Sequence, residues 1–389
     1  MTKKVLFYHD EFPNGGAERV TIDVANYVSS YNYEIFVVAC KVNFCSNTKI
    51  TVLQLPRQQS LMEAENMSFI VDVIHSLSID IFILPIHLNI SLLKLVKEKT
   101  DCKLIFSLHC VPYWEVVSHL YIKKRKAEGN ILKTLEWWLI TYPKTMWLKK
   151  YHKRIGECHR QIYNLVDAYT VLCDEYRDIL QKKLALPIDS NKLHVIYNSE
   201  TPVLEISQQK RRQLLYVGRI SYDDKRVDRL MYIWGKICKR VPEWELIVVG
   251  DGEYKQNVEL LATELKLERI RFVGYQSDVR SFYKNASILC LTSNFEGWPL
   301  ALTEAQANGV IPFAFNCTAG VQKILAPSGV NGILIPPYRL DKYAKELLSL
   351  MSNPQRMDEM RQNVILKAKE YSPDRIGEKW LNLFELLCN

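Results

Sequence analysis

Short, continuous apolar runs recur along most of the chain, and polar or helix-forming segments separate them. A strand that is apolar at nearly every position is covered on both faces, which is typical of parallel sheets flanked by helices. The pattern therefore predicts an α/β protein with two successive sets of parallel strands. The first set of predicted strands covers 5–9, 34–39, 51–55, 81–84, 104–108, 168–172 and 194–197, and the second covers 214–217, 246–249, 270–273, 288–291, 311–314 and 332–335.

Helical periodicity fills the intervals between these strands and sets the domain boundaries. We expect two doubly wound domains that face a central cleft, an N-terminal one over 1–200 and a C-terminal one over 201–373, with a polar linker at 199–212. Residues 374–389 carry apolar side chains on one helical face, so we expect this helix to pack back toward the N-terminal domain. Other predicted helices cover 17–28, 226–240, 254–266, 299–308 and 340–352.

Composition excludes several classes of protein. The 389 residues are 48% hydrophobic and 24% charged, as in an ordinary soluble protein, and the N-terminus runs into the first predicted strand without a cleavable leader. Ten scattered cysteines without a C-x-x-C pair disfavour a zinc ribbon and are typical of reduced, buried thiols. No apolar run reaches the length of a membrane-spanning helix, so we expect a cytoplasmic protein.

The net charge of +8 is concentrated in one segment that interrupts the strand pattern. Residues 121–160 contain eleven lysines and arginines against three glutamates, within a stretch at about 113–163 that we expect to be a helical insertion. Trp137, Trp138 and Trp147 are interleaved with these cations, which suits an element that lies on an anionic membrane. A helical pair that packs its tryptophans on the N-terminal domain fits equally well. No nucleic-acid-binding module surrounds the segment, so we expect no nucleic acid partner.

The stretch 295–305 carries the clearest chemical signal. It follows the predicted strand 288–291, and Pro299 stands where the first residue of a helix belongs. A strand, a tight Glu-Gly turn and a helix N-terminus together present free backbone N–H groups to an anion. Glu304 follows Glu296 by eight positions, and carboxylates accept hydrogen bonds from the paired hydroxyls of a sugar. The alternative is a helix N-terminus whose dipole merely favours acidic residues.

Two cations follow the first strand of the C-terminal domain. Arg219 comes directly after the strand 214–217, and Lys225 lies in the next loop. Two fixed cations neutralise a diphosphate through charge-assisted hydrogen bonds without a metal. Arg226 stands beside Lys225, so the sequence leaves open which of the two is the second cation.

Together these motifs resemble the retaining glycosyltransferases of family 4. The resemblance rests on the order of four features, which are a Gly15-Gly16 loop, His109 at a strand end, V-G-R followed by Lys225, and an E-x7-E pair. A Gly-Asp-Gly turn that begins at Gly250 also fits. The chain departs from the family pattern in three places, where Arg226 and Ser199 stand for glycines and Gln322-Lys323 replaces a glutamate.

The resemblance implies a GT-B fold, in which two Rossmann-like domains face each other. It implies a transferase that moves a hexose from a nucleotide diphosphate sugar to a hydroxyl of a surface glycan or lipid-linked oligosaccharide, with retention of configuration. We expect no metal or other cofactor, UDP in preference to GDP, and a location in the cytoplasm or on the inner face of the cell membrane. The alternative is a catalytically weak partner that binds sugar nucleotides or docks on a membrane in a glycan-assembly complex.

The same resemblance assigns roles to individual residues. Arg219 and Lys225 would stabilise the leaving diphosphate, and Glu304 would bind the ribose hydroxyls. Glu296 would hold the donor sugar with the N–H groups of its turn, and His109 would contact that sugar. The implied catalytic residues are His109, Arg219, Lys225 and Glu296, and the implied donor-binding residues are Gly16, Arg219, Lys225, Gly250, Asn294, Glu296, Gly297, Trp298, Pro299, Leu300 and Glu304.

Overall fold

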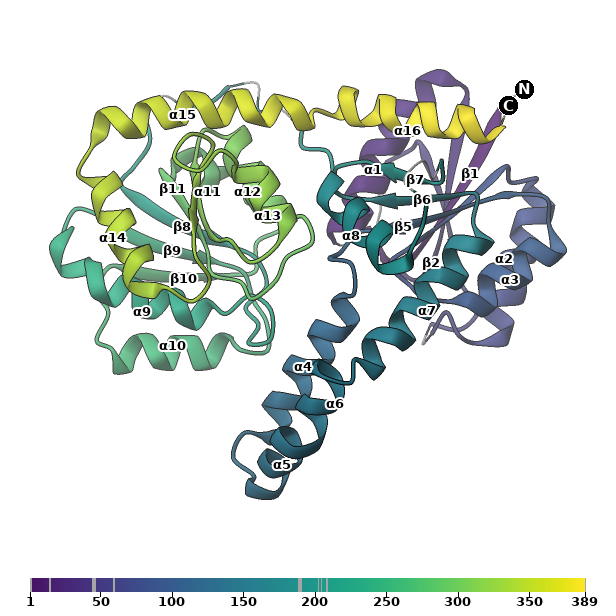
Figure 1. Cartoon of the computed structure of the whole chain (residues 1–389). Helices are drawn as coiled ribbons and strands as arrows, with labels where there is room; N and C mark the ends of the chain where they lie inside the picture. Colours follow the sequence, from purple (N-terminus) through teal and green to yellow (C-terminus); the bar gives the residue numbers. More distant parts are fainter. Residues whose placement is uncertain are drawn as a thin grey trace. The chain divides into compact units, whose positions relative to one another are not determined.

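The fold is given by a computed structural model of the chain (Figure 1). It describes residues 2–13, 15–43, 47–58, 60–187, 191–201, 203, 205–207 and 209–388. The chain divides into two compact units, one formed by Met1–Ser199 together with Pro373–Asn389 and the other by Glu200–Ser372. Positions 202, 204 and 208 of the expected linker lie outside the described residues.

The first unit contains a seven-stranded sheet in the order β3-β2-β1-β4-β5-β6-β7, and all its strand pairs are parallel. The order reverses between β1 and β4, and ligands of such sheets bind at the carboxyl ends of the strands beside this reversal. The predicted parallel sheet is confirmed. Its strands are β1 (Lys3–Phe12), β2 (Tyr33–Val42), β3 (Ile50–Gln54), β4 (Ile81–Pro85), β5 (Lys103–Leu108), β6 (Ala168–Val171) and β7 (Leu193–Val195).

Helices cover both faces of this sheet. α1 (Gly16–Val28) and the C-terminal helix α16 (Pro373–Cys388) share a core with β1, to which Val5, Phe7 and Trp380 contribute. Leu6 is buried as well and points to the opposite face, because side chains alternate along a strand. The unit also contains the 3₁₀ turn η1 (Ser29–Tyr31), α2 (Ala64–Leu77), α3 (Ile90–Lys99) and α8 (Asp174–Leu184).

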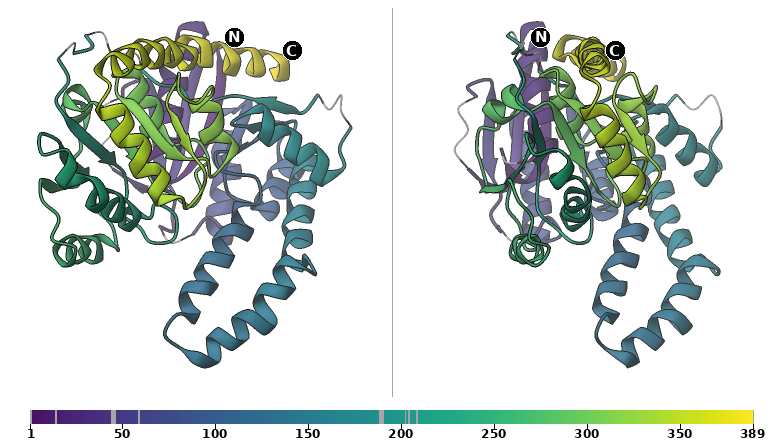
Figure 2. Two further views of the ribbon diagram at one scale, coloured as in Figure 1. Left: turned by 60° about the vertical axis from the view of Figure 1, so that its left-hand side comes forward. Right: turned by 90° about the vertical axis from the view of Figure 1, so that its left-hand side faces the viewer.

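Between β5 and β6 the chain forms a helical hairpin that projects away from the sheet of its own unit (Figures 1 and 2). Trp137 packs inside this hairpin against Tyr142, whereas Trp138 and Trp147 are 58% and 75% exposed. This differs from the alternative in which the tryptophans pack on the N-terminal domain. The arms are α4 (Trp114–Ala127) and α7 (Lys150–Leu165), and the tip is formed by α5 (Ile131–Glu136), the π-helical turn η2 (Trp137–Thr141) and α6 (Tyr142–Met146). No helix in the described part of the chain is long and apolar enough to cross a membrane.

The second unit contains a six-stranded sheet in the order β10-β9-β8-β11-β12-β13, again with parallel pairs throughout. Its order reverses between β8 and β11, which places the loops after these two strands at the expected ligand edge. The strands are β8 (Gln213–Val217), β9 (Glu245–Val249), β10 (Ile270–Gly274), β11 (Ile288–Leu291), β12 (Ile311–Phe315) and β13 (Ile333–Ile335).

The helices of the second unit connect these strands or follow the last of them. They are α9 (Val227–Ile237), the 3₁₀ turn η3 (Cys238–Arg240), α10 (Lys255–Glu264), α11 (Arg280–Asn285), α12 (Leu300–Ala307), α13 (Ala319–Leu325), α14 (Leu340–Met351), α15 (Pro354–Ala368) and the 3₁₀ turn η4 (Lys369–Tyr371). Pro299 precedes α12 with an extended ψ of 105°, which is the conformation of an N-cap residue. The expectation that Pro299 is the first helical residue is therefore wrong by one position.

Candidate functional site

The loop between β8 and α9 holds Arg219 at the edge of the second sheet. Its guanidinium donates to Asp224 Oδ2 at 2.7 Å, and the hydroxyl of Ser221 donates to the other oxygen of the same carboxylate. Burial by itself would raise the pKa of Asp224, but the hydrogen bond from Ser221 and the charges of Arg219 and Lys225 outweigh it and lower the pKa. Asp224 is therefore a carboxylate that fixes the direction of Arg219.

Lys225 reaches from the same loop to the turn after β11. Its Nζ donates to both oxygens of Glu296, at 2.7 and 2.9 Å, and the Ser293 hydroxyl donates to Glu296 Oε1 at 2.6 Å. The Thr318 hydroxyl donates to the backbone oxygen of Glu296 at 2.7 Å and so holds the turn itself. The structure thus brings together two of the predicted catalytic residues, Lys225 and Glu296, which are 71 positions apart.

Arg226 points elsewhere. Its guanidinium binds both oxygens of Asp228, with Nε–Oδ1 and Nη2–Oδ2 distances of 2.9 and 2.8 Å, and it lies 4.3 Å from the ring centre of Tyr222. The backbone φ of Arg226 is +50°, a left-handed conformation in which glycine carries no penalty. The sequence left open whether Lys225 or Arg226 is the second cation. In the structure it is Lys225 that contacts Glu296.

The turn after β11 and the start of α12 contain most of the predicted donor-binding residues. Asn294 accepts from Arg229 Nη2 at 2.6 Å and donates to the Asp223 carbonyl at 2.7 Å, so it ties this turn to the loop after β8. Gly297 follows Glu296 in the turn, and Trp298 is buried edge-on against Tyr371 with ring centres 5.2 Å apart. Pro299 caps α12 and Leu300 begins it, which leaves the first N–H groups of the helix at this edge of the sheet.

Glu304 lies one turn into α12. Tyr283, on α11, donates its hydroxyl to Glu304 Oε2 at 2.7 Å, and Tyr283 is itself buried. A hydrogen bond from a buried hydroxyl fixes one oxygen of the carboxylate and orients the other. Sequence reasoning missed Tyr283 because no motif connects it with Glu304, and it missed Asp224 because an acidic residue in a loop carries no signal by itself.

Gly250 occupies the loop after β9 with a φ of +137°. A Cβ at this position would overlap the carbonyl oxygen of Gly218, so the two loops can pack only because residue 250 is a glycine. The backbone N–H of Ile220 donates to the Asp251 carbonyl at 2.8 Å and joins the same loops. The structure therefore gives Gly250 a packing function, whichever groups its loop contacts.

The first unit holds the other two predicted residues. Gly16 begins α1, directly after Gly15 with its φ of +131°. His109 follows β5, and its Nδ1 lies 3.3 Å from Asn198 Oδ1 while its Nε2 lies 3.0 Å from the Ser107 hydroxyl. Burial lowers the pKa of His109 to about 4, against a smaller opposite effect of the Asn198 hydrogen bond, so the imidazole is neutral near pH 7.

A second histidine in this unit was not predicted as a site residue. His9 is buried near the end of β1, with Nδ1 3.3 Å from Glu18 Oε1 and Nε2 2.8 Å from the Thr21 hydroxyl. Because Glu18 and Thr21 both lie on α1, His9 fixes the first turns of this helix to the sheet. The only sequence signal for it was the position of His9 at a strand end.

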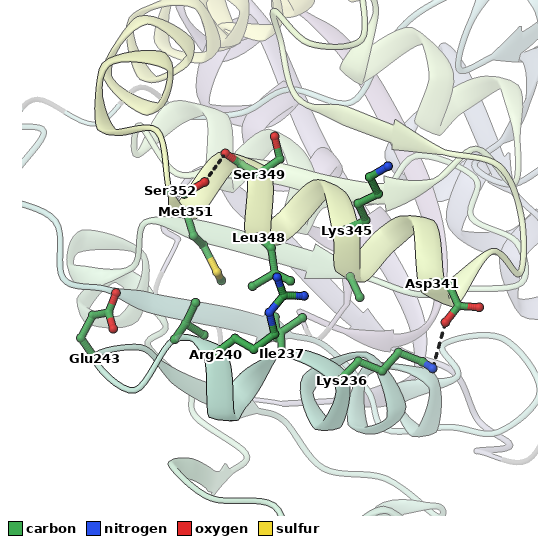
Figure 3. A pocket seen from close by; sticks show the side chains of 12 residues that line it. Lys236, Ile237, Arg240, Glu243, Asp341, Lys345, Leu348, Ser349, Met351 and Ser352 are labelled. Atoms are coloured by element: carbon green, nitrogen blue, oxygen red, sulfur yellow. Dashed lines mark hydrogen bonds and ion pairs between the residues drawn. The ribbon is translucent and has the colours of Figure 1, made fainter.

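Two further observations concern metal ligands and a pocket of the second unit. Among the described residues, no group of three or more His, Cys, Asp or Glu side chains is arranged to hold a metal ion. A pocket of about 860 Å³ in the second unit is lined by α9, η3 and α14, where Lys236 pairs with Asp341 at 2.9 Å (Figure 3). None of the residues that line this pocket is among the predicted site residues.

The chain matches two sequence families that divide it into the same halves. Residues 203–370 match the family described as Glycosyl transferases group 1, and residues 14–199 match Glycosyltransferase Family 4. The chain therefore belongs to the family 4 glycosyltransferases, and the resemblance inferred from its motifs is confirmed.

Individual relatives agree with this assignment. An uncharacterized glycosyltransferase of Haemophilus influenzae is 25% identical over 375 residues, which are 94% of this chain and 95% of that protein. The lipopolysaccharide 1,6-galactosyltransferase of Salmonella typhimurium is 27% identical over 248 residues, which are 61% of this chain and 64% of that protein. The structure of Anabaena HepE in complex with UDP-glucose has a TM-score of 0.73 at 16% identity and covers 98% of this chain and 99% of that one. This likeness confirms the predicted GT-B fold.

Proposed function

We propose that this glycosyltransferase moves a hexose from a nucleotide diphosphate sugar, UDP in preference to GDP, to a hydroxyl of a surface glycan on a lipid-linked acceptor. The observation that carries the proposal is the gathering of Arg219, Lys225, Glu296 and the N-terminus of α12 at the strand-order reversal between β8 and β11. The HepE structure with UDP-glucose supports the donor class, and the Salmonella relative supports a glycan acceptor.

The charges at this edge suit a diphosphate leaving group. Arg219 and Lys225 supply two cations, and the free N–H groups at the start of α12 supply a third positive region. In this proposal they neutralise the charge that develops on the departing diphosphate, so no metal ion is required. The proposal takes two further points from the family to which the chain belongs. These are retention of configuration and the contact of His109 with the sugar.

Lys225 would have to change partners when the donor binds. It is held by both oxygens of Glu296, so a phosphate that takes Lys225 frees this carboxylate for the hydroxyls of the donor sugar. Glu304, oriented by Tyr283, would accept from the ribose hydroxyls. Binding of the diphosphate and of the sugar would therefore be coupled through one ion pair.

A thermal-shift screen with UDP-, GDP-, ADP- and TDP-sugars in EDTA tests this site. A ligand at a hundred times its Kd stabilises the protein by about 2.7 kcal/mol. We expect one nucleotide to do so for the wild type and for the control Arg280→Ala, which removes an exposed cation of the same unit. Arg219→Ala and Glu304→Ala should lose the shift, and a full shift in both would overturn the site. Donor binding without transfer to any glycan acceptor would favour the catalytically weak binding partner.

The projecting hairpin supports a peripheral contact of residues 121–160 with an anionic membrane at the cytoplasmic face. Its tip exposes Ile131, Leu139 and Trp147 at 81%, 72% and 75%, and its arms carry most of the excess positive charge. Apolar side chains that enter the lipid boundary next to cations that attract anionic head groups are typical of interfacial helices.

Co-sedimentation with vesicles tests the membrane contact. We expect Leu139→Ser/Trp147→Ser to lower binding to vesicles of phosphatidylglycerol, while Leu260→Ser, at an exposed apolar position of the other unit, leaves it unchanged. Equal binding by all three proteins would refute the contact. Dimer formation that the tip variant abolishes would assign the tip to a second copy of the chain instead.

A further inference from the structure

A cavity of about 550 Å³ lies at the base of the hairpin, in the first unit. Its wall combines three parts of the chain, which are the residue before α4, one face of α7 with the residue that precedes it, and the last turn of α8. A cavity of this size accommodates a small molecule or a polar head group. The side chains that matter here are Tyr113, Lys149, His152, Lys153, Arg160 and Lys183.

The charges in this cavity are poorly balanced. Glu157 is the one carboxylate in its lining, and its nearest ion pair is a loose one to Arg160 at 4.0 Å. Within the described ranges, no carboxylate forms an ion pair with Lys149, Lys153 or Lys183. Lys149, Lys153 and Lys183 are exposed, and all three line the same cavity.

The cations also act on one another. Burial lowers the pKa of Lys183, and the nearby charge of Lys149 lowers it further. The pKa of His152 is lowered by burial first and then by Lys183 and Lys149, and its Nδ1 is buried without a hydrogen-bond partner. An anion placed among these groups would relieve their repulsion and accept their hydrogen bonds.

Tyr113 packs closely against two other parts of the cavity wall. Lys183 Nζ lies 4.1 Å above the ring centre of Tyr113, a cation–π contact with a buried ring. Gly156 lets α7 come this close, because a Cβ there would lie 2.8 Å from the Tyr113 hydroxyl. Tyr113 follows His109 by four positions, so the cavity is close in sequence to the strand end that carries the predicted catalytic histidine.

The cavity also continues the apolar tip. Lys149 directly follows Trp147 and Leu148, which are exposed, and Lys153 and Arg160 succeed it on one face of α7. Residues four and seven positions apart lie along one side of a helix. A ligand with an apolar tail at the tip would therefore carry its polar head into the cavity.

We propose that this cavity binds the phosphate or diphosphate group of the lipid that carries the acceptor glycan. The inference rests on the proposed function, since it assigns the acceptor of that reaction a site of its own. The ligand class follows from the converging cations, the single carboxylate and the adjoining apolar tip. The cavity is lined by residues of the first unit, whereas Arg219 and Lys225 belong to the second, so the two sets of cations share no residue.

The test compares two variants with equal loss of charge. Lys153→Gln/Lys183→Gln removes two cavity cations, and the control Lys124→Gln/Lys144→Gln removes two exposed cations of the same hairpin outside the cavity. Binding is measured by calorimetry with inorganic pyrophosphate and by co-sedimentation with phosphatidylcholine vesicles that carry a polyprenyl diphosphate or, at equal charge, phosphatidylglycerol.

We expect the cavity variant to bind the polyprenyl diphosphate vesicles about tenfold more weakly than the wild type and the control do, since two charge-assisted contacts are lost. The wild type should prefer these vesicles to phosphatidylglycerol vesicles. An equal loss in both variants would show attraction by general charge and overturn the proposal. If pyrophosphate binding depends on the cavity but the protein does not prefer the diphosphate lipid, the cavity binds a soluble phosphate compound. That result would overturn the proposal of a lipid ligand.

Donor binding separates this inference from the proposed function. The cavity variant should keep the thermal shift with the nucleotide sugar that stabilises the wild type, and its melting temperature without ligand should match that of the control. A lost donor shift in the cavity variant would place the donor in the cavity and overturn the proposal. If the wild type has no donor shift but binds the diphosphate lipid, the proposed function fails and the cavity site stands.

Discussion

Replacing Lys225 by methionine removes the cation of the Lys225–Glu296 ion pair, which lies at the edge of the second sheet where we expect the donor to bind. Lys225 Nζ contacts both oxygens of Glu296, and the two side chains are only 21% and 8% exposed. Methionine keeps most of the volume of the lysine stem, so the change acts on charge more than on packing. The Glu296 carboxylate would keep the hydrogen bond from Ser293 but lose its neutralising partner.

The structure sets the size of the effect. Two charges about 4 Å apart attract by about 4 kcal/mol at the effective dielectric near a protein surface, and removing one partner of a buried pair costs about 3–5 kcal/mol. Because a fifth of the Lys225 side chain reaches solvent, we expect the lower end, about 3 kcal/mol. For a unit of this size, each kcal/mol of lost stability lowers the melting temperature by about 2–4 °C. The expected fall in melting temperature is therefore about 6–12 °C.

Calorimetry of the whole chain measures this with a double-mutant cycle. Lys225→Met and Glu296→Gln should each destabilise the second unit, and the double variant should be about 2 kcal/mol more stable than the sum predicts. Arg280→Met is the control, because its pair with Asp278 is exposed and solvent screening should leave it a small contribution to stability. Additivity of the two single changes within about 0.5 kcal/mol would refute the reasoning.

Three further predictions concern single residues. Arg226→Gly should leave the Kd for the donor, measured by calorimetry, within about threefold of the wild type, because the φ of +50° at this position suits glycine. If Arg226→Gly lost as much donor affinity as Lys225→Met, Arg226 would be the second cation. Tyr283→Phe should weaken donor binding about tenfold, because it removes the hydrogen bond that orients Glu304. An unchanged Kd for the donor would contradict this. The pKa of His109 is about 4 in the fold, below its ordinary value, so the unfolded chain binds the proton first as pH falls. Stability should therefore decline between about pH 6.5 and 4, less steeply in His109→Gln, and parallel pH profiles would contradict this.

The strands could be predicted because burial on both faces leaves a direct trace in the sequence. Val5, Leu6 and Phe7 are all buried although they alternate between two faces, so the run is apolar throughout. The hairpin could be located from composition, but its packing could not. Trp137 and Trp138 are adjacent and equally apolar, yet the first is buried and the second is exposed, which the pattern of the sequence does not show.

The sequence nominated the residues of the candidate site, but it could not predict their contacts. The motifs pointed to the edge of the sheet where Lys225 and Glu296 meet, yet the choice between Lys225 and Arg226 depended on which carboxylate each side chain contacts. The partner of Glu304 depended on the packing of α11 against α12, which no local pattern encodes. Sequence patterns report burial and turns, whereas pairing across elements follows only from the assembled fold.

The two sets of cations in this protein differ in how they are neutralised. In the loop after β8, Arg219, Lys225 and Arg226 each have a carboxylate partner within 2.8 Å. The lysines of the hairpin cavity have no such partners among the described residues. A phosphate at the donor edge must therefore compete with a carboxylate, so its binding needs the further contacts of nucleoside and sugar, which discriminates against free phosphate. A phosphate in the cavity displaces only water and counterions, so its binding should weaken more steeply as salt is raised.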